Sequence, residues 1–307
     1  DEKTLSKIPE TKIEYYGDWN TEEFTAEVLY IEDKKVILCR TYFYPTSGGQ
    51  EHDDGDINSN QIIELHRVGK HIVHILKETP KFKVGDKVTC HIDIKRRKQL
   101  TQHHSATHLI GAAARTILGN HINQAGAHKK VSEAHIDITH FSSLSKSEEK
   151  AIETEANRLV KEGITINKFF MPRTEAEQKF SVRIYQGGVA PGKELRIVDI
   201  QGVDTQACGG THLNNTSEAE QIVIVSSSKI SDSVLRIIFK AGNAAKIHLE
   251  GGANIAGNAT KLLSCKIAEL PSYASALFSL WKKGKKAVKK GKTFDSILNK
   301  DNLQSKE

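Results

Sequence analysis

Long apolar runs are absent from this sequence of 307 residues, and no charged-then-apolar segment opens it. The first absence argues against a membrane span, and the second argues against a secretory signal peptide. Cysteine is scarce, and its four residues lie too far apart for the disulfide pattern of a small secreted protein. A reducing cytoplasm is therefore the expected compartment. The cysteines are Cys39, Cys90, Cys208 and Cys265.

Methionine is rarer still, because Met171 is the only one and the sequence starts at Asp1. We therefore expect a piece of a longer polypeptide. The length suggests two domains, or one domain with appendages. The net charge of +6 is compatible with a polyanionic partner. The basic residues are spread widely, however, and an ordinary solvated surface explains them equally well.

The first 92 residues predict a small β-barrel. Short β-rich runs alternate there with polar turns, and no convincing helix interrupts them, which is typical of a barrel. The expected strands are residues 24–31, 36–41, 61–67, 71–76 and 87–94.

Residues 93–245 predict an α+β domain with helices set against a largely antiparallel sheet. Apolar residues at helical spacing predict a helix over 96–118, which Gly119 would end. Ser145 and Glu148 form a capping box that opens a second helix, expected to run to residue 162. The expected strands are residues 134–139, 164–170, 195–200, 219–225 and 234–240.

Residues 246–307 predict a helical, lysine-rich C-terminal segment with a polar end. Pro271 interrupts the helical pattern, and a further helical stretch follows it. Residues 282–292 form a lysine tract, which is more typical of a solvated helix with weak phosphate affinity than of a dedicated RNA-reading element.

Two short segments predict a metal site. His104 and His108 are four residues apart on the predicted helix, so both imidazoles project from one face. This pair is weak evidence alone, because the sequence contains 14 histidines. Cys208 and His212 are also four apart, and the intervening Gly209-Gly210 lets the backbone turn tightly. Three nitrogen ligands and one sulfur ligand suit zinc.

The residues between the two histidines argue against a metalloprotease. Such an enzyme has a glutamate directly after the first histidine as its general base. Here Ser105, Ala106 and Thr107 fill that gap. A purely structural zinc with four protein ligands remains an open alternative from spacing alone.

These motifs resemble the editing domain of alanyl-tRNA synthetases and the free-standing alanyl-tRNA editing proteins. The paired motifs read HSATH at 104–108 and CGGTH at 208–212. The segments FYPTSGGQ at 43–50, QAG at 124–126 and GGVAPGK at 187–193 agree with the resemblance, which covers about residues 20 to 245. No adenylate-forming or tRNA-recognition motif is seen, so a C-terminal fragment of an archaeal-type synthetase or a long free-standing protein is expected.

The resemblance implies zinc-dependent hydrolysis of Ser-tRNA(Ala) and Gly-tRNA(Ala), with the tRNA(Ala) acceptor end as partner. The rest of a synthetase is a further expected partner, and a membrane is not. The implied zinc ligands are His104, His108, Cys208 and His212. Thr107 and Gln124 match pocket positions, and with Cys208 they form the expected catalytic set. Gly48, Gly49 and Gln50 match a loop near the acceptor end.

Plainer interpretations stay open for several of these residues. Thr107 could bond its own helix backbone, and Gln124 could be a solvent-facing loop amide. The Gly48-Gly49 segment could be an ordinary tight turn. For the whole chain, the alternatives are a non-catalytic zinc-stabilised RNA-binding module and an editing enzyme of the threonyl type.

Overall fold

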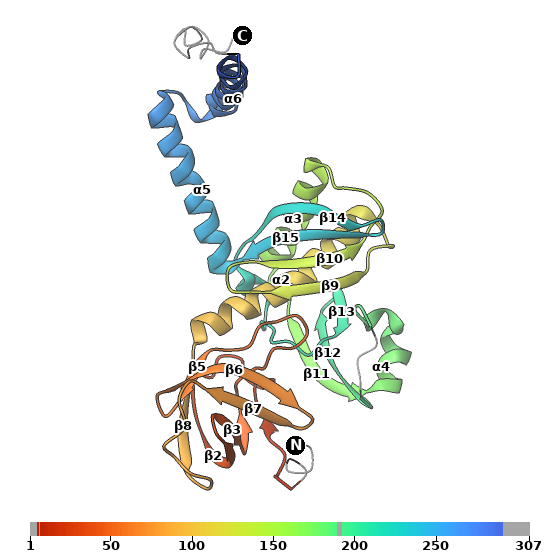
Figure 1. Ribbon diagram of the computed structural model, residues 1–307. Coiled ribbons are helices and arrows are strands. Elements are labelled where there is room, and N and C mark those ends of the chain that lie inside the picture. Colours follow the sequence, from red (N-terminus) through yellow and green to blue (C-terminus); the bar gives the residue numbers. More distant parts are fainter. Residues whose placement is uncertain (1–4, 6, 189–191, 291–307) are drawn as a thin grey trace. The chain divides into compact units, whose positions relative to one another are not determined.

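The computed structural model describes residues 5, 7–188 and 192–290. The chain divides into two compact units, Asp1–Lys246 and Ile247–Glu307. The first unit contains a barrel and an α+β region, and the second contains helices. The α+β fold expected from the sequence is therefore confirmed (Figure 1).

Six antiparallel strands close the expected barrel, in the order β2-β3-β7-β6-β5-β8. Its interior is apolar, and Val28, Leu38 and Leu76 are completely buried there. The last strand ends two residues earlier than predicted, because Asp93 begins a helix. The barrel strands are β2 (Glu23–Glu32), β3 (Lys35–Leu38), β5 (Gly55–Ile57), β6 (Asn60–Val68), β7 (His71–Leu76) and β8 (Lys87–Ile92). Outside the barrel, β1 (Lys12–Ile13) pairs with β4 (Arg40–Thr41).

The long helix α2 (Ile94–Leu118) connects the barrel to the α+β region (Figure 1). It begins two residues before the predicted start, because the side chain of Asp93 accepts hydrogen bonds from the backbone N–H groups of Lys95 and Arg96. Gly119 ends it, as predicted, with a φ of 114°. The middle of the helix is buried almost continuously, including its histidines.

The α+β region contains two antiparallel sheets, where the sequence predicted one. The four-stranded sheet has the order β14-β15-β10-β9, and α3 packs on it; the three-stranded sheet has the order β11-β12-β13. The capping box that opens α3 is confirmed. The elements are α3 (Lys146–Glu162), α4 (Arg173–Phe180), β9 (Gln124–Lys129), β10 (Ala134–Thr139), β11 (Ile166–Pro172), β12 (Glu194–Ile200), β13 (Asp204–Ala207), β14 (Ile222–Ser231) and β15 (Val234–Ala241).

Several local predictions differ from the structure, which also contains β1, β5 and α4 that the sequence did not predict. Residues 216–219 form a short 3-10 helix, η2 (Thr216–Ala219), so the strand expected from residue 219 starts only at Ile222. The sequence did not predict β9 or β13. Their strand pattern is weak because polar and small residues dominate them. Pairing with β10 and β12 holds these two strands in the sheets instead.

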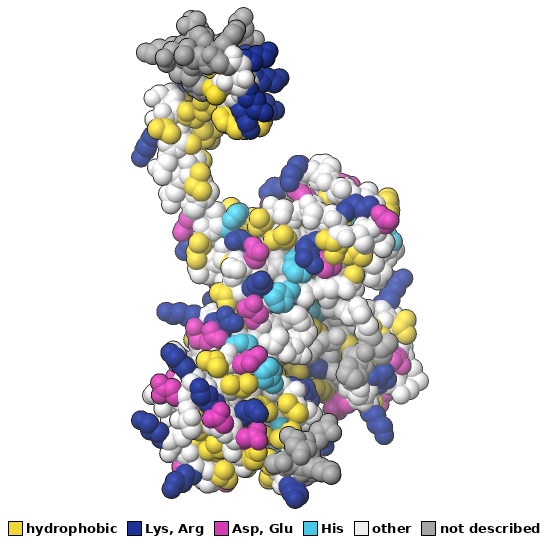
Figure 2. Space-filling view, viewed as in Figure 1, with side chains coloured by type: hydrophobic (Ala, Val, Ile, Leu, Met, Phe, Trp, Pro, Cys, Tyr) yellow, Lys and Arg dark blue, Asp and Glu magenta, His cyan; other side chains and the backbone are white. Residues whose placement is uncertain are grey.

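The helical C-terminal segment consists of α5 (Gly242–Leu263), η3 (Ile267–Glu269) and α6 (Leu270–Val288). Pro271 lies in the first turn of α6, where a proline is tolerated, so the predicted break is confirmed. Lys282, Lys285 and neighbouring lysines are exposed along α6 (Figure 2). The end of the lysine tract at 291–292 lies outside the described residues. Within the described part of the chain, no helix combines the length and apolarity needed to cross a membrane.

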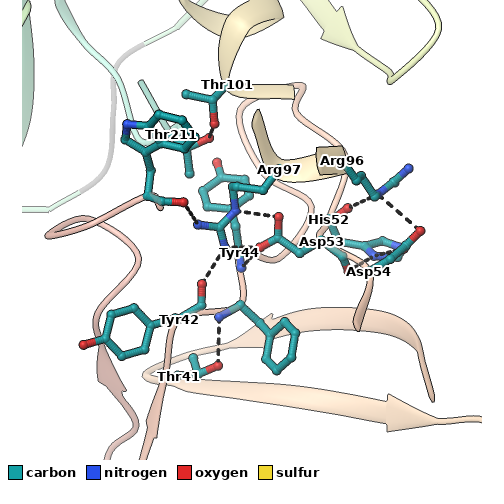
Figure 3. A network of polar contacts seen from close by, with 12 residues as sticks. Thr41, Tyr42, Tyr44, His52, Asp53, Asp54, Arg96, Arg97, Thr101 and Thr211 are labelled. Carbon is teal, nitrogen blue, oxygen red and sulfur yellow. Dashed lines mark hydrogen bonds and ion pairs between the residues drawn. The ribbon is translucent and has the colours of Figure 1, made fainter. Parts of the chain in front are cut away.

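A buried ion pair joins the start of α2 to the barrel (Figure 3). Arg97 and Asp53 are both fully buried, and Nε of Arg97 donates to Oδ1 of Asp53 at 2.6 Å. The guanidinium also donates to the backbone oxygens of Tyr42 and Trp19. Asp53 in turn accepts from the N–H of Tyr44 at 2.5 Å. The charges are therefore both paired and hydrogen-bonded, which a buried pair requires.

Replacing Arg97 with methionine should destabilise the first unit by about 3–5 kcal/mol, because Asp53 would remain buried without its counter-charge. Denaturant unfolding of the full chain measures this loss. Lys95→Met, at an exposed position on the same helix, serves as the control and should change stability by less than about 0.5 kcal/mol. Equal stability of the two variants would contradict a structural role for the pair.

Candidate metal centre

Four side chains from two segments meet in the core of the first unit: His104, His108, Cys208 and His212. Their potential ligand atoms all lie within 4.8 Å of one another. Sγ of Cys208 lies 3.3 Å from Nε2 of His104 and 3.3 Å from Nε2 of His212. Two ligands of a tetrahedral zinc ion are separated by about 3.6 Å when one is sulfur and one is nitrogen. The cluster therefore has nearly the size that zinc requires.

The tight turn at residues 208–212 brings the second pair of ligands against helix α2. A Cβ atom at Gly210 would stand 1.9 Å from Cε1 of His104. Only glycine therefore allows this loop to approach the ring so closely. At the neighbouring Gly209, the nearest atom to such a Cβ is the hydroxyl oxygen of Tyr16 at 3.4 Å. The two glycines that the sequence singled out therefore have different roles.

The protonation states favour metal binding. Burial raises the pKa of the Cys208 thiol, but the imidazoles of His104 and His212 outweigh this and hold the pKa well below its usual value. Burial lowers the pKa of His104 to about 4 and that of His212 well below its usual value. Zinc binds thiolate and neutral imidazole. These are the forms that the pKa directions favour at three of the four positions.

His108 differs from the other two histidines. Burial lowers its pKa, but Asp204 and Cys208 more than compensate and raise it to about 9. Both of its ring nitrogens are buried and neither makes a hydrogen bond among the described residues, although Oδ2 of Asp204 lies 3.3 Å from Nδ1. A cation at the centre of the cluster would satisfy Nε2 and displace its proton. The unpartnered Nε2 is thus an observation of this structure that fits a bound metal.

The Nδ1 atoms of the three rings face three different outer partners. Nδ1 of His104 lies 2.7 Å from Oε1 of Gln50. Nδ1 of His212 lies 3.2 Å from Oγ of Ser105, and Nδ1 of His108 lies 3.3 Å from Oδ2 of Asp204. Such partners fix the orientation of a ring and leave its Nε2 for the metal. The arrangement therefore presents Nε2 of each histidine to the centre.

Further contacts hold the turn at residues 208–212 in place. Arg196 donates from Nη1 to the backbone oxygens of Cys208 and Gly210, at 2.8 and 2.9 Å. The hydroxyls of Tyr16 and Tyr44 both lie 3.1 Å from the backbone oxygen of Gly209. The guanidinium of Arg196 also lies over the ring of Tyr16, 4.4 Å from its centroid. The turn is therefore held from the barrel side and from β12.

The two predicted pocket residues, Thr107 and Gln124, lie in different surroundings. Thr107 is buried on α2 between the two histidine ligands, and its hydroxyl donates to the backbone oxygen of His103 at 2.8 Å. Gln124 is half-buried at the start of β9, and its side chain makes no hydrogen bond within the described residues. A Cβ atom at Gly187 would lie 3.1 Å from the oxygen of Ala125 and 4.0 Å from that of Gln124, so Gly187 lies beside the start of β9.

The barrel segment at residues 47–50 forms a tight turn beside the cluster. Gly48 and Gly49 have φ values of 56° and 71°, and the N–H of Gln50 donates to the oxygen of Ser47 at 2.9 Å. Positive φ at both central residues strongly favours glycine. Gln50 is fully buried, and its amide also bonds Thr211. Its contact with His104 is one that the sequence analysis did not predict.

Several residues of this site were missed from the sequence. Asp204, Arg196, Tyr16 and Tyr44 come from three segments that are distant in the chain. One signal for Asp204 was available. In a strand, positions 204 and 208 lie on the same face, and both residues are buried, so Asp204 could have been expected on the side of Cys208. For Tyr16 and Tyr44 no local pattern indicates the contact, since it depends on how the barrel meets the turn.

Gly210→Ala should weaken metal binding by at least about tenfold, because the new methyl group would displace the ring of His104. Competition with a chromophoric chelator measures the affinity. Gly209→Ala provides a matched control one residue away and should bind the metal within about twofold of the natural protein. If both variants bound equally well, the close approach of this turn to His104 would be refuted.

Two family descriptions match parts of the chain. Residues 5–96 match tRNA synthetases class II (A), and residues 195–238 match the threonyl and alanyl tRNA synthetase second additional domain. The cluster therefore has two ligands, Cys208 and His212, within the second match.

Similar proteins include several alanine–tRNA ligases of archaea. The ligase of Methanopyrus kandleri is 39% identical over 293 residues, which cover 92% of this chain and 32% of the relative. That of Pyrococcus abyssi is 39% identical over 294 residues, or 94% of this chain and 32% of the relative. That of Methanococcus vannielii is 36% identical over 281 residues, again 92% and 32%. This chain therefore spans about a third of the length of these relatives. The chain corresponds to the C-terminal region of the archaeal alanine–tRNA ligases, including the second additional domain.

Proposed function

We propose that this chain hydrolyses serine and glycine from mischarged tRNA(Ala), with zinc as cofactor, as the editing region of a longer alanyl-tRNA synthetase. The buried cluster of three histidines and one cysteine carries the proposal, with Thr107 in the same turn of α2 as two of the histidines. The similarity to alanine–tRNA ligases supports tRNA(Ala) as the substrate. The ATP-dependent ligation would belong to the rest of that polypeptide, in the cytoplasm.

The chemistry of alanine explains why an editing site is needed. Serine is alanine with an added hydroxyl, and glycine is alanine without its methyl group. A synthetic pocket discriminates one methyl by only about 1–3 kcal/mol, and an apolar pocket rejects an added hydroxyl weakly. A second site that hydrogen-bonds the hydroxyl can supply the missing discrimination.

Thr107 and Gln124 would supply the polar groups of such a site. The hydroxyl hydrogen of Thr107 is engaged by the backbone of His103, so its oxygen can still accept from the ammonium or hydroxyl group of a seryl ester. The amide of Gln124 can both donate and accept. The N–H groups of Gly48 and Gly49 have no partner among the described residues, and we assign them to the tRNA acceptor end.

Zinc at this centre would supply Lewis-acid polarisation of the ester or of the attacking water. The residues of the chain would hold it through three imidazoles and the Cys208 thiolate. Cys208 belongs to the catalytic set in this sense, as a residue that would hold the metal. No carboxylate follows His104 in α2 as it does in a metalloprotease. Asp204 approaches Nδ1 of His108, on the side of that ring away from Nε2. We therefore assign the proton transfer to the terminal ribose hydroxyl of the substrate.

Two other functions remain as outcomes of a test. Four protein ligands are typical of structural zinc sites, which favours a non-catalytic RNA-binding module. The second additional domain is shared by threonyl and alanyl enzymes, which keeps threonyl-type editing in view. Metal content alone would not separate these functions from the one proposed.

A deacylation panel tests the proposal. The chain should hydrolyse Ser-tRNA(Ala) and Gly-tRNA(Ala) much faster than Ala-tRNA(Ala), and a chelator or Cys208→Ala should abolish the reaction because the metal is lost. Release of the labelled amino acid measures the rate. Faster hydrolysis of Ser-tRNA(Thr) would indicate threonyl-type editing. Binding of tRNA without hydrolysis would indicate the RNA-binding module, and either result would overturn the proposal.

Gln124→His should change the ratio of the Ser-tRNA(Ala) and Ala-tRNA(Ala) rates while leaving the zinc content unchanged, because Gln124 is not one of the four residues of the cluster. The comparison of kcat/KM for the two substrates measures this change. His128→Gln, further along β9, serves as a control that should keep the natural ratio. An equal loss for both substrates would count against a discriminating role for Gln124.

A further inference from the structure

Lys129, the last residue of β9, has an unusual environment for a lysine. Its side chain is buried, with 1% of its surface exposed. No carboxylate lies within ion-pair distance of it among the described residues, and its only hydrogen-bond partner there is the backbone oxygen of Gly48, 2.9 Å from Nζ. Burial lowers the pKa of Lys129 to about 8. The charge of Cys208 acts in the opposite direction and raises that pKa. A buried ammonium group without a carboxylate partner is costly, so the hydrogen bond to Gly48 has a specific stabilising role.

The contact that Lys129 makes is with the turn at residues 47–50. Besides the Nζ contact, the N–H of Lys129 donates to the oxygen of Gly49 at 2.6 Å. The N–H of Glu51 donates to the oxygen of Lys129 at 3.2 Å. One residue of the α+β region thus holds three consecutive peptide groups of a barrel loop, and it forms a parallel bridge with Gln50.

The fit between this turn and β9 is close. A Cβ atom at Gly49 would lie 2.0 Å from the backbone oxygen of Ala127. At Gly48, by contrast, the corresponding space is open. The turn therefore packs tightly against β9 at Gly49, and the ammonium group of Lys129 donates a hydrogen bond to the oxygen of the adjacent Gly48.

The next residue of the turn connects it to the metal centre. Oε1 of Gln50 lies 2.7 Å from Nδ1 of His104 and accepts from the N–H of Thr211 at 3.1 Å. Nε2 of Gln50 donates to the hydroxyl of Thr211 at 2.8 Å, and that hydroxyl lies 2.7 Å from the hydroxyl of Thr101. Thr211 therefore fixes the side-chain amide of Gln50 through hydrogen bonds. Lys129 fixes the backbone of the turn that carries Gln50.

We infer that Lys129 is a positioning residue of the metal centre. It clamps the turn at residues 47–50 onto β9 and so holds Gln50 where its amide fixes the ring of His104. The barrel then contributes to the metal centre without supplying a ligand. This inference rests on the metal site of the proposed function, but not on hydrolysis of any ester.

The first test measures zinc affinity in the full chain by chelator competition. Lys129→Met should weaken zinc binding by about 10–100-fold, the usual effect of losing an outer partner of a ligand. Lys129→Gln, a shorter hydrogen-bond donor, should weaken it less. Lys130→Met removes the exposed neighbouring lysine and should leave the affinity unchanged. Unchanged affinity in a folded Lys129→Met variant would overturn the inference.

A double-mutant cycle separates positioning from general destabilisation. If Lys129 acts through Gln50, the effects of Lys129→Met and Gln50→Leu on zinc affinity should not add, because either change releases the ring of His104. Additive effects would overturn the inference. In the metal-free natural protein, nitrogen NMR should show the proton of the His104 ring on Nδ1, where it is donated to Gln50. A ring protonated on Nε2 alone would contradict the role of Gln50 in positioning that ring.

A measurement on the natural protein covers the case in which Lys129→Met fails to fold. Acetylation followed by peptide mapping should modify Lys129 at least tenfold more slowly than Lys130, since its amine is buried under the turn. Comparable rates would overturn the clamp. None of these measurements depends on deacylation. If the chain gave the expected results in them but hydrolysed no mischarged tRNA, the role of Lys129 would stand and only the proposed function would fail.

Discussion

A neutral imidazole can offer one nitrogen to a metal only if its other nitrogen keeps a hydrogen-bond partner in the core. This constraint governs the first unit, because α2 is buried through its middle although polar side chains occupy much of that stretch. Nδ1 of each cluster histidine faces a polar group from a different part of the chain. Gln50 from the barrel hydrogen-bonds His104, Ser105 from α2 itself hydrogen-bonds His212, and Oδ2 of Asp204 from β13 lies 3.3 Å from Nδ1 of His108. The metal centre is thus assembled by the whole unit.

The same constraint explains why the barrel and the α+β region must meet in a fixed way. The ion pair between Arg97 and Asp53 joins the start of α2 to the barrel. One helical turn further on, Thr101 meets Thr211, and beyond it His104 meets Gln50. Polar contacts of this kind depend on direction and distance. They therefore fix how the barrel meets the α+β region more narrowly than apolar packing alone would.

Sequence alone predicted the components better than their connections. Five of the six barrel strands and the two main helices follow local periodicity and capping and were predicted, whereas the three-residue strand β5 was not. The four residues of the cluster were singled out because the spacing of each pair is local and their donor atoms suit zinc; that they bind a metal stays a proposal. By contrast, Asp204, Arg196 and Lys129 act through contacts between segments far apart in the chain, and no local pattern reports these. Strands β9 and β13 were missed for the same reason, since their pairing partners define them. Gln50 was singled out from the family resemblance, but its contact with His104 required the fold.

X-ray absorption spectroscopy of the zinc-loaded chain reports the atoms bound to the metal, and so tests whether the four-residue cluster is the metal centre. One zinc ion should be bound by three nitrogen ligands at about 2.0–2.1 Å and one sulfur ligand at about 2.3 Å. The sulfur contribution should disappear when Cys208 is replaced by alanine. A first shell without sulfur, or one unchanged by that replacement, would contradict the assignment of His104, His108, Cys208 and His212 as the metal centre.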